Sequence, residues 1–427
     1  MNAHLDAVVR AQAAGRPVGL TSVCSAHPLV IEAALVQGRA DRAPVLIEAT
    51  SNQVDQFGGY TGLRPADFRR LVEDLATGVG FPVDDLVLGG DHLGPHRWRD
   101  QDSDTAMAHA EDLVRAYVAA GYTKLHLDCS YPCADDGGVL DGEVMAARAA
   151  RMLRAAEDEA ARVGLTGSLR YVIGTEVPVP GGADHEITRL EPTTAASARA
   201  TLDHHRTAFG TVGLAEVWPQ VMALVVQPGV EFDHVRVFDY DHGATTSLRS
   251  ALDDQPAMVF EAHSTDYQTE EALSALVADG WAVLKVGPGL TFALREALFA
   301  LAAIEAELLP GGRRSELPGV VEARMLAHPG QWEGYYTGTP EEQALARRYS
   351  FSDRMRYYWP DPEIEASVRT LLQNLDGDLP DPLLSAFLPV QYDRVRRGVL
   401  ERSPRELVID RVRDVLRTYA AAVTPPD

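Results

Sequence analysis

The chain has 427 residues, 46% of them hydrophobic, and a formal net charge of −23 at pH 7. This length is ample for a large buried core, and the negative charge makes nucleic acid and anionic membrane surfaces poor partners. Residues 1–16 follow an amphipathic helical pattern without the apolar core of a signal peptide, and no apolar run is long enough to span a bilayer. The three cysteines, Cys24, Cys129 and Cys133, are a sparse and odd number. They favour a reducing cytoplasm and buried structural thiols over a disulfide framework, a metal site or a redox site.

After the first helical pattern, short apolar runs alternate with amphipathic segments. The apolar runs predict eight buried strands, at residues 18–23, 43–49, 86–90, 124–128, 170–175, 223–227, 257–262 and 282–286. Helical patterns lie between most of them, at residues 29–37, 65–77, 105–120, 142–163 and 193–209, and another begins near residue 291. Buried strands without polar alternation indicate a parallel sheet. The alternation therefore predicts a (β/α)8 TIM barrel over residues 1–308, since no Gly-rich nucleotide fingerprint follows the first strand.

The pattern changes after residue 308. Pro310-Gly311-Gly312 interrupts the chain, and residues 309–427 predict a mostly helical extension that packs on the barrel and could cover its mouth. Within it, residues 349–360 are rich in tyrosine and arginine. Arg354 and Arg356 there are candidate substrate-binding residues in a lid or phosphate clamp, and the alternative is an aromatic–arginine packing corner.

Polar residues stand where the predicted strands end. Asp91 and His92 follow the apolar run 86–90, at the end of a strand where parallel α/β folds place their chemistry. The residues at the other strand ends are Glu48, Asp128, Glu176, Gln227, His263, Asp266 and Lys285. Carboxylates and imidazoles gathered at one barrel mouth indicate either a divalent-metal site or a paired acid–base site.

Two separated histidines and a carboxylate suit zinc, or nickel, manganese or cobalt. We expect His92, His263 and Glu176 to be the ligands, with Asp91, Asp128 and Glu176 as candidate acid–base residues. The alternative for each histidine is a satisfied structural group, and His126 is expected to be structural.

The remaining candidates are substrate-binding residues. Short hydrogen-bonding side chains that suit a polyhydroxylated substrate are Glu48, Ser51, Asn52, Gln53, Gln227 and Asp266. Lys285 is expected to neutralise a carboxylate or phosphate, with a Schiff base as the alternative. Gly287, Gly289 and Thr291 open a helix after the last strand, where their amides could hold a phosphate.

Several segments of the chain resemble one protein family. These segments are residues 21–28, 47–60, 89–95, 174–182, 225–232, 260–268 and 349–360. They are similar to the tagatose-1,6-bisphosphate aldolase Z subunit family, also called GatZ/KbaZ-like or non-catalytic, and the resemblance covers essentially the whole chain.

The resemblance implies a barrel related to the metal-dependent class II aldolases. In those enzymes an Asp-His pair after the third strand supplies a base and a metal ligand, which matches Asp91 and His92, and a later histidine matches His263. Gln227 stands where the class II pattern has a further histidine, so a three-histidine site of that kind is not expected. Family members either support a separate class II aldolase subunit or act alone as C4-epimerases.

We therefore predict a cytoplasmic, metal-dependent C4-epimerase of a ketohexose or ketohexose phosphate of the tagatose or fructose type. Retro-aldol cleavage of the C3–C4 bond is expected, because the proton on C4 is not alpha to the carbonyl group. The alternative is a non-catalytic stabilising subunit of a class II tagatose-1,6-bisphosphate aldolase. Clustered carboxylates favour the enzyme, since they repel one another without a cation. A homo-oligomer is compatible with either function.

Overall fold

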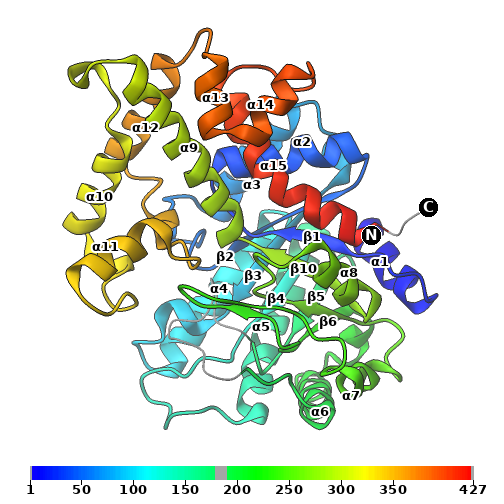
Figure 1. The fold of residues 1–427 in the computed structure, drawn as a ribbon. Helices are drawn as coiled ribbons and strands as arrows, with labels where there is room; N and C mark the ends of the chain where they lie inside the picture. The colour runs from blue at the N-terminus through cyan, green and yellow to red at the C-terminus, as the bar shows by residue number, and fades with distance from the viewer. Residues whose placement is uncertain (1, 178–189, 425–427) are drawn as a thin grey trace.

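The computed structural model describes residues 2–177 and 190–424 (Figure 1). Eight parallel strands close into a barrel in the order β1-β10-β9-β6-β5-β4-β3-β2. These strands are β1 (Leu20–Val23), β2 (Val45–Thr50), β3 (Leu86–Leu93), β4 (Lys124–Leu127), β5 (Arg170–Ile173), β6 (Val221–Val225), β9 (Val259–Ala262) and β10 (Trp281–Val286). The predicted TIM barrel is confirmed. Residues 178–182 of the segment 174–182, which carries part of the family resemblance, lie outside the described residues.

Helices surround the barrel. They are α2 (Pro28–Asp41), α3 (Pro65–Gly78), α4 (Ser103–Ala119), α5 (Gly142–Val163), α6 (Ala195–Thr211), α8 (Glu270–Ala278) and α9 (Pro288–Leu308). The connection from β6 to β9 differs, because it contains the hairpin β7 (Glu231–Phe232) and β8 (Val237–Phe238) and only a four-residue helix, α7 (Thr246–Arg249). The sequence pattern did not predict this hairpin, since two-residue strands are too short to show a period.

The N-terminal helix α1 (Ala3–Ala13) closes one end of the barrel. Its Leu5, Val8 and Val9 pack with the apolar side chains that the strands point inward, among them Leu20 and Val172. An amphipathic helix whose apolar side meets an open barrel end removes that side from water. The functional side chains are therefore confined to the opposite end, where the strands finish.

The chain after α9 is helical. Its helices are α10 (Leu317–Ala327), α11 (Pro340–Tyr349), α12 (Pro362–Asn374), α13 (Asp381–Phe387), α14 (Pro389–Arg396) and α15 (Pro404–Val423). Short 3₁₀ turns complete the fold, namely η1 (Val83–Asp85), η2 (Pro95–Trp98), η3 (Ala215–Gln220), η4 (Ser250–Leu252), η5 (Gly311–Arg313), η6 (Pro329–Gln331) and η7 (Arg354–Tyr357). None of the described helices combines the length and the apolar composition of a membrane-spanning segment.

The last helix returns to the barrel. Helix α15 packs against α2, α8 and α9, and the amide of Gly19 before β1 donates to the carbonyl of Val423 at 2.9 Å. Figure 1 shows α15 beside β1 and α8, with both chain ends on the same side of the molecule. In contrast, α10, α11 and α12 lie beyond α9, away from the strands.

The segment around η7 lies over the barrel mouth. The hydroxyl of Tyr267, after β9, donates to the carbonyl of Phe351 at 2.6 Å. The amide of Phe351 donates to the carbonyl of His234, after β7. The ring of Tyr357 meets that of Tyr60, which follows β2, edge to face with centroids 4.9 Å apart. This segment, residues 349–360, is called the tail segment below. It is thus joined to loops that leave three different strands.

A buried ion pair fixes this segment to α9. Asp353 accepts from the Nε of Arg295 at 3.2 Å and from the hydroxyl of Thr291 at 2.6 Å, and both side chains of the ion pair are almost fully buried. Asp353 has a left-handed backbone, with φ of 41°, which non-glycine residues rarely adopt without support from their surroundings.

We expect the change Arg295→Met to lower the free energy of unfolding by about 3 kcal/mol, because it leaves the Asp353 carboxylate buried without its cation. Chemical denaturation followed by circular dichroism measures this change. The control is Arg397→Met, which breaks the exposed pair between Arg397 and Asp393 and should cost below about 1 kcal/mol. Equal decreases in the free energy of unfolding of the two variants would contradict a larger contribution from the buried pair.

Candidate functional site

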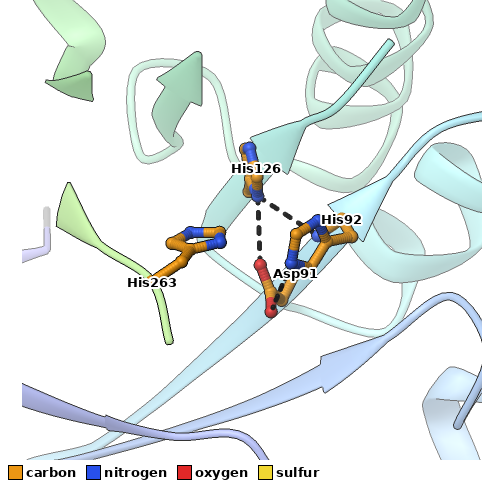
Figure 2. Close-up of side chains that lie close together, drawn as sticks. All are labelled: Asp91, His92, His126 and His263. Carbon is orange, nitrogen blue, oxygen red and sulfur yellow. Dashed lines mark hydrogen bonds and ion pairs between the residues drawn. The ribbon is translucent and has the colours of Figure 1, made fainter. Parts of the chain in front are cut away.

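Four buried side chains meet at the mouth of the barrel. Asp91, His92, His126 and His263 each offer one ligand atom, and these atoms all lie within 4.8 Å of one another. Figure 2 shows the three imidazoles arranged around the carboxylate. Asp91 and His92 belong to β3, His126 belongs to β4, and His263 follows β9 directly. We call these four residues the mouth cluster.

An irregularity in β3 brings two consecutive side chains into the mouth cluster. Successive residues of a regular strand point to opposite faces of the sheet. The pairing of β3 with β4 shifts register between Gly90 and Leu93, and His92 has a left-handed φ of 47°. This bulge lets Asp91 and His92 face the same site. Gly89 is also required, because a Cβ there would lie 2.2 Å from the carboxylate of Glu48.

Each imidazole of the mouth cluster has a carboxylate partner. The Nδ1 of His92 donates to Asp128 at 2.8 Å, the Nδ1 of His126 lies 3.0 Å from Asp91, and the Nε2 of His263 lies 3.0 Å from Glu261. The Nδ1 of His126 is shared, because it also accepts from the amide of His92 at 3.3 Å. A carboxylate that accepts from one ring nitrogen fixes the tautomer and leaves the lone pair of the other nitrogen available. This is the arrangement of histidines that bind metal ions.

Two of the remaining ring nitrogens have no partner in the described part of the chain. The Nε2 of His126 and the Nδ1 of His263 are buried and make no hydrogen bond there. Burial lowers the pKa of His263 to about 3, despite the hydrogen bond to Glu261, so this imidazole is neutral and able to act as a ligand. The donor set of the mouth cluster therefore fits a divalent cation.

Beneath the mouth cluster, two lysines bridge the carboxylates. The Nζ of Lys124 lies 2.9 Å from Glu48 and 2.7 Å from Glu261. The Nζ of Lys285 lies 2.7 Å from Glu48, 2.8 Å from Asp91 and 3.5 Å from Glu261. We call these five residues the lysine network. Their side chains are nearly all without solvent contact, since the most exposed of them is Lys285 at 5%.

The charges of the lysine network do not balance. Burial opposes ionisation of Asp91 and Glu261, but the neighbouring cations outweigh it and hold the pKa of both carboxyls well below its usual range. Burial is likewise outweighed at Asp128, whose pKa is lowered by the hydrogen bond from His92. Within the lysine network, three carboxylates face two ammonium groups, which leaves one negative charge in a buried region. Asp128 pairs instead with His92; burial lowers the pKa of His92, but Asp91 and Asp128 outweigh burial and raise it. A divalent cation in the mouth cluster would neutralise the excess negative charge.

Lys285 is placed for ion pairing and not for a Schiff base. Burial lowers its pKa, but Asp91, Cys24 and the two glutamates outweigh this effect and raise the pKa well above its usual range. A Schiff base requires a neutral amine as the nucleophile. The ion pairs keep this amine protonated, so the structure favours the expected neutralising role of Lys285.

Glu176 does not lie in the mouth cluster, contrary to the expected ligand set. Its side chain is exposed and accepts hydrogen bonds from the hydroxyls of Thr193, at 2.6 Å, and Ser197. The reason is that β5 ends at Ile173, so the chain has turned towards the start of α6 before it reaches Glu176. His126, expected to be structural, occupies the mouth cluster instead.

Two other expected roles differ in the structure. Gln227 closes the turn after β6, because its Oε1 accepts from the amides of Gly229 and Val230 at 2.8 and 2.9 Å. Asp128 holds His92 and also accepts from the hydroxyl of Ser130 at 2.6 Å, so both of its oxygens are engaged. These contacts suit positioning more than proton transfer.

The expected phosphate site after the last strand is filled by a side chain. The Oδ1 of Asp266 accepts from the amides of Gly287 and Gly289, at 2.9 and 2.7 Å. The hydroxyl of Thr291 donates to Asp353. A carboxylate within the chain thus takes the place that a ligand anion was expected to occupy.

A pocket opens above the mouth cluster. Expected substrate-binding residues that line it are Asn52, Gln53, Asp266, Lys285, Gly287 and Arg356. Ser51 lies beneath it, where its hydroxyl donates to the carbonyl of His92 at 3.0 Å. Arg354 is not among the lining residues, since its guanidinium stacks on the ring of Tyr335 at 3.3 Å from the centroid.

Residues that the sequence pattern did not identify are His126, Lys124 and Glu261. The sequence did contain a signal for these three residues, because charged residues and histidine are rare inside fully buried strands and therefore indicate a functional site. Their short strands hid which face each residue occupies.

A closed (β/α)8 barrel with imidazoles and carboxylates at the carboxyl ends of its strands defines a TIM-barrel protein with a candidate metal centre. A family model described as D-tagatose-1,6-bisphosphate aldolase subunit GatZ/KbaZ-like matches residues 5–424. The chain therefore belongs to this family, as the sequence resemblance predicted.

Solved structures are similar to this chain. The structure of a probable tagatose 6 phosphate kinase from Sinorhizobium meliloti 1021 is 48% identical to this chain, covers 95% of this chain and 100% of its own, and has a TM-score of 0.87. The YdjI aldolase from Escherichia coli K12 is 11% identical, with coverage of 85% and 94% and a TM-score of 0.41. A fructose-bisphosphate aldolase from Campylobacter jejuni is 12% identical, with coverage of 86% and 90% and a TM-score of 0.43.

The structure and the sequence pattern make different predictions about metal binding. We expect His126→Ala to lower metal affinity by about tenfold or more, because it removes a member of the mouth cluster. Glu176→Ala should keep the metal content of the unchanged protein. Zinc stoichiometry after dialysis, measured by plasma mass spectrometry, distinguishes them. Loss of zinc from the Glu176 variant with retention in the His126 variant would restore the ligand set expected from the sequence.

Proposed function

We propose that this chain is a divalent-metal-dependent C4-epimerase of a ketohexose or ketohexose phosphate of the tagatose or fructose type. The observation that supports the proposal is the mouth cluster, in which three imidazoles meet a carboxylate and two ring nitrogens have no partner among the described residues, above a buried excess of negative charge. A chain that only stabilised a partner would gain stability from apolar residues in these places. Buried carboxylates at these positions have a physical reason if a cation and a substrate bind at the mouth of the barrel.

The proposed reaction is a retro-aldol cleavage followed by an aldol addition. The C4 hydroxyl loses its proton, the C3–C4 bond breaks, and the fragment that contains C3 keeps the bonding electrons. The aldehyde fragment then rotates, and C3 attacks its other face, which inverts C4. The C4 oxygen finally takes up a proton. A bound divalent cation would supply Lewis-acid stabilisation of the negative charge on the sugar oxygens.

Residues of this chain divide the work of the reaction. His92, His126 and His263 would hold the cation, each oriented by its carboxylate. Asp91 is the proposed acceptor of the C4 hydroxyl proton. Its Oδ1 is engaged by Lys285 and His126, and the carboxylate lines the pocket.

The tail segment supplies the other side of the pocket. Tyr357 and Arg356 line it, and the Nη2 of Arg356 donates to the hydroxyl of Tyr357 at 2.9 Å. Burial raises the pKa of Tyr357, but Arg356 and Arg354 outweigh burial and lower it below its usual value. Tyr357 is therefore the proposed partner for proton exchange at C4 on the side of the tail segment. The tail segment would also keep the aldehyde fragment from escaping.

Substrate deuterated at C4 tests the route. We expect the label to remain on carbon in the epimerised product, because the C4–H bond is never broken, and mass spectrometry of the product measures it. Exchange of the label with solvent would rule out the retro-aldol route.

The change Asp91→Asn should lower kcat by about 100-fold, since it removes the proton acceptor while keeping the shape of the side chain.

A second candidate function follows from the family description, which names an aldolase subunit. In that case the chain would be a non-catalytic partner that stabilises a class II aldolase. Incubation of the purified chain alone with fructose, tagatose and their 6-phosphates separates the two functions. We expect epimerisation without a partner. An inert chain that lengthens the half-life of a class II aldolase would establish the partner function instead.

A further inference from the structure

The start of α9 is closed to an outside anion. In TIM barrels the amides after the last two strands commonly bind a substrate phosphate, because a helix N-terminus carries unsatisfied donors and a positive dipole. Here the amides of Gly287 and Gly289 donate to Asp266, whose side chain is 97% buried. The approach is close, since a Cβ at position 289 would lie 3.1 Å from the Asp266 Oδ1.

The cations near this point are also engaged. Lys285 is paired with three carboxylates of the lysine network. The guanidinium of Arg356 donates to the carbonyls of Ser352 and Asp353 and to the hydroxyl of Tyr357. Both cations therefore have partners among the described residues, and the charge of Arg356 also acts on the Asp266 carboxylate, where it opposes the effect of burial on the pKa.

Asp266 and Gly287 line the same pocket as Asp91, His92 and His263. A six-carbon ketose with its middle carbons over the mouth cluster extends its terminal carbons along the pocket walls, one of which is the start of α9. The carboxylate of Asp266 is an acceptor that suits a hydroxyl group. Burial raises the pKa of Asp266 to about 6, so the side chain is ionised at pH 8 and repels a phosphate.

We infer that the substrate end lying against α9 carries a free hydroxymethyl group, and that Asp266 excludes a phosphate from this end. The inference rests on the proposed function and narrows its substrate class. A ketohexose 1,6-bisphosphate has a phosphate at each end, so either orientation would bring one against Asp266. Free ketohexoses and monophosphates can place their unphosphorylated end there.

Isothermal titration calorimetry of the metal-loaded protein at pH 8, with fructose, fructose 6-phosphate and fructose 1,6-bisphosphate, tests the inference. We expect the bisphosphate to bind at least about tenfold more weakly than the better of the other two ligands. The change Asp266→Ala frees the two amides and should improve bisphosphate binding by about tenfold.

The matched variant Asp266→Asn tests whether a phosphate is excluded because the side chain fills the amide site or because the side chain is negatively charged. Its side-chain oxygen can still accept from both amides, so it should keep most of the discrimination and fold as the unchanged protein does. Bisphosphate binding as tight as that of the monophosphate in the unchanged protein would overturn the inference, as would an Asp266→Ala protein that folds but gains no bisphosphate affinity.

Binding and epimerisation of the bisphosphate give different results according to which of the two proposals is wrong. If the chain binds fructose or its 6-phosphate and rejects the bisphosphate without epimerising any sugar, the inference holds and the epimerase proposal fails. If the chain epimerises the bisphosphate efficiently, the epimerase proposal holds and the inference fails.

Discussion

The site depends on the lysine network, in which two buried ammonium groups bridge three buried carboxylates. Removing such charges from water costs several kcal/mol for each ion, and attraction inside the protein offsets this cost only when the geometry is good. Here Lys124 and Lys285 each lie within 3 Å of two carboxylate groups. The five residues come from five strands of the barrel, so the network requires those strands to keep their register.

The lysine network also orients the mouth cluster. Asp91 and Glu261 belong to the network, and the same carboxylates contact His126 and His263. Asp128 performs this role for His92 from outside the network. Three carboxylate–histidine contacts thus determine how three imidazoles are turned, which is the common way in which proteins prepare histidines for metal binding. The proposed chemistry therefore relies on a charge arrangement that lies mainly below the substrate pocket.

The tail segment completes the pocket that the barrel begins. The pair of Arg295 and Asp353 fixes η7 to α9, and α9 itself begins where Asp266 caps its first amides. Arg356 and Tyr357 consequently face the mouth cluster from the side opposite to the barrel floor. One helix therefore positions both the closed anion site and the segment that covers the pocket.

The sequence by itself determined the barrel and three of the four residues of the mouth cluster. Strand–helix alternation predicts the fold because the period of apolar residues follows from backbone geometry, and Asp91, His92 and His263 stand where strands end. Tertiary structure decided the rest. Four-residue strands do not reveal which face His126 and Glu261 occupy, and the turn after β5 carries Glu176 towards α6. Only folding brings Asp266 to the amides of Gly287 and Gly289, because a hydrogen bond across some twenty residues leaves no local pattern in the chain.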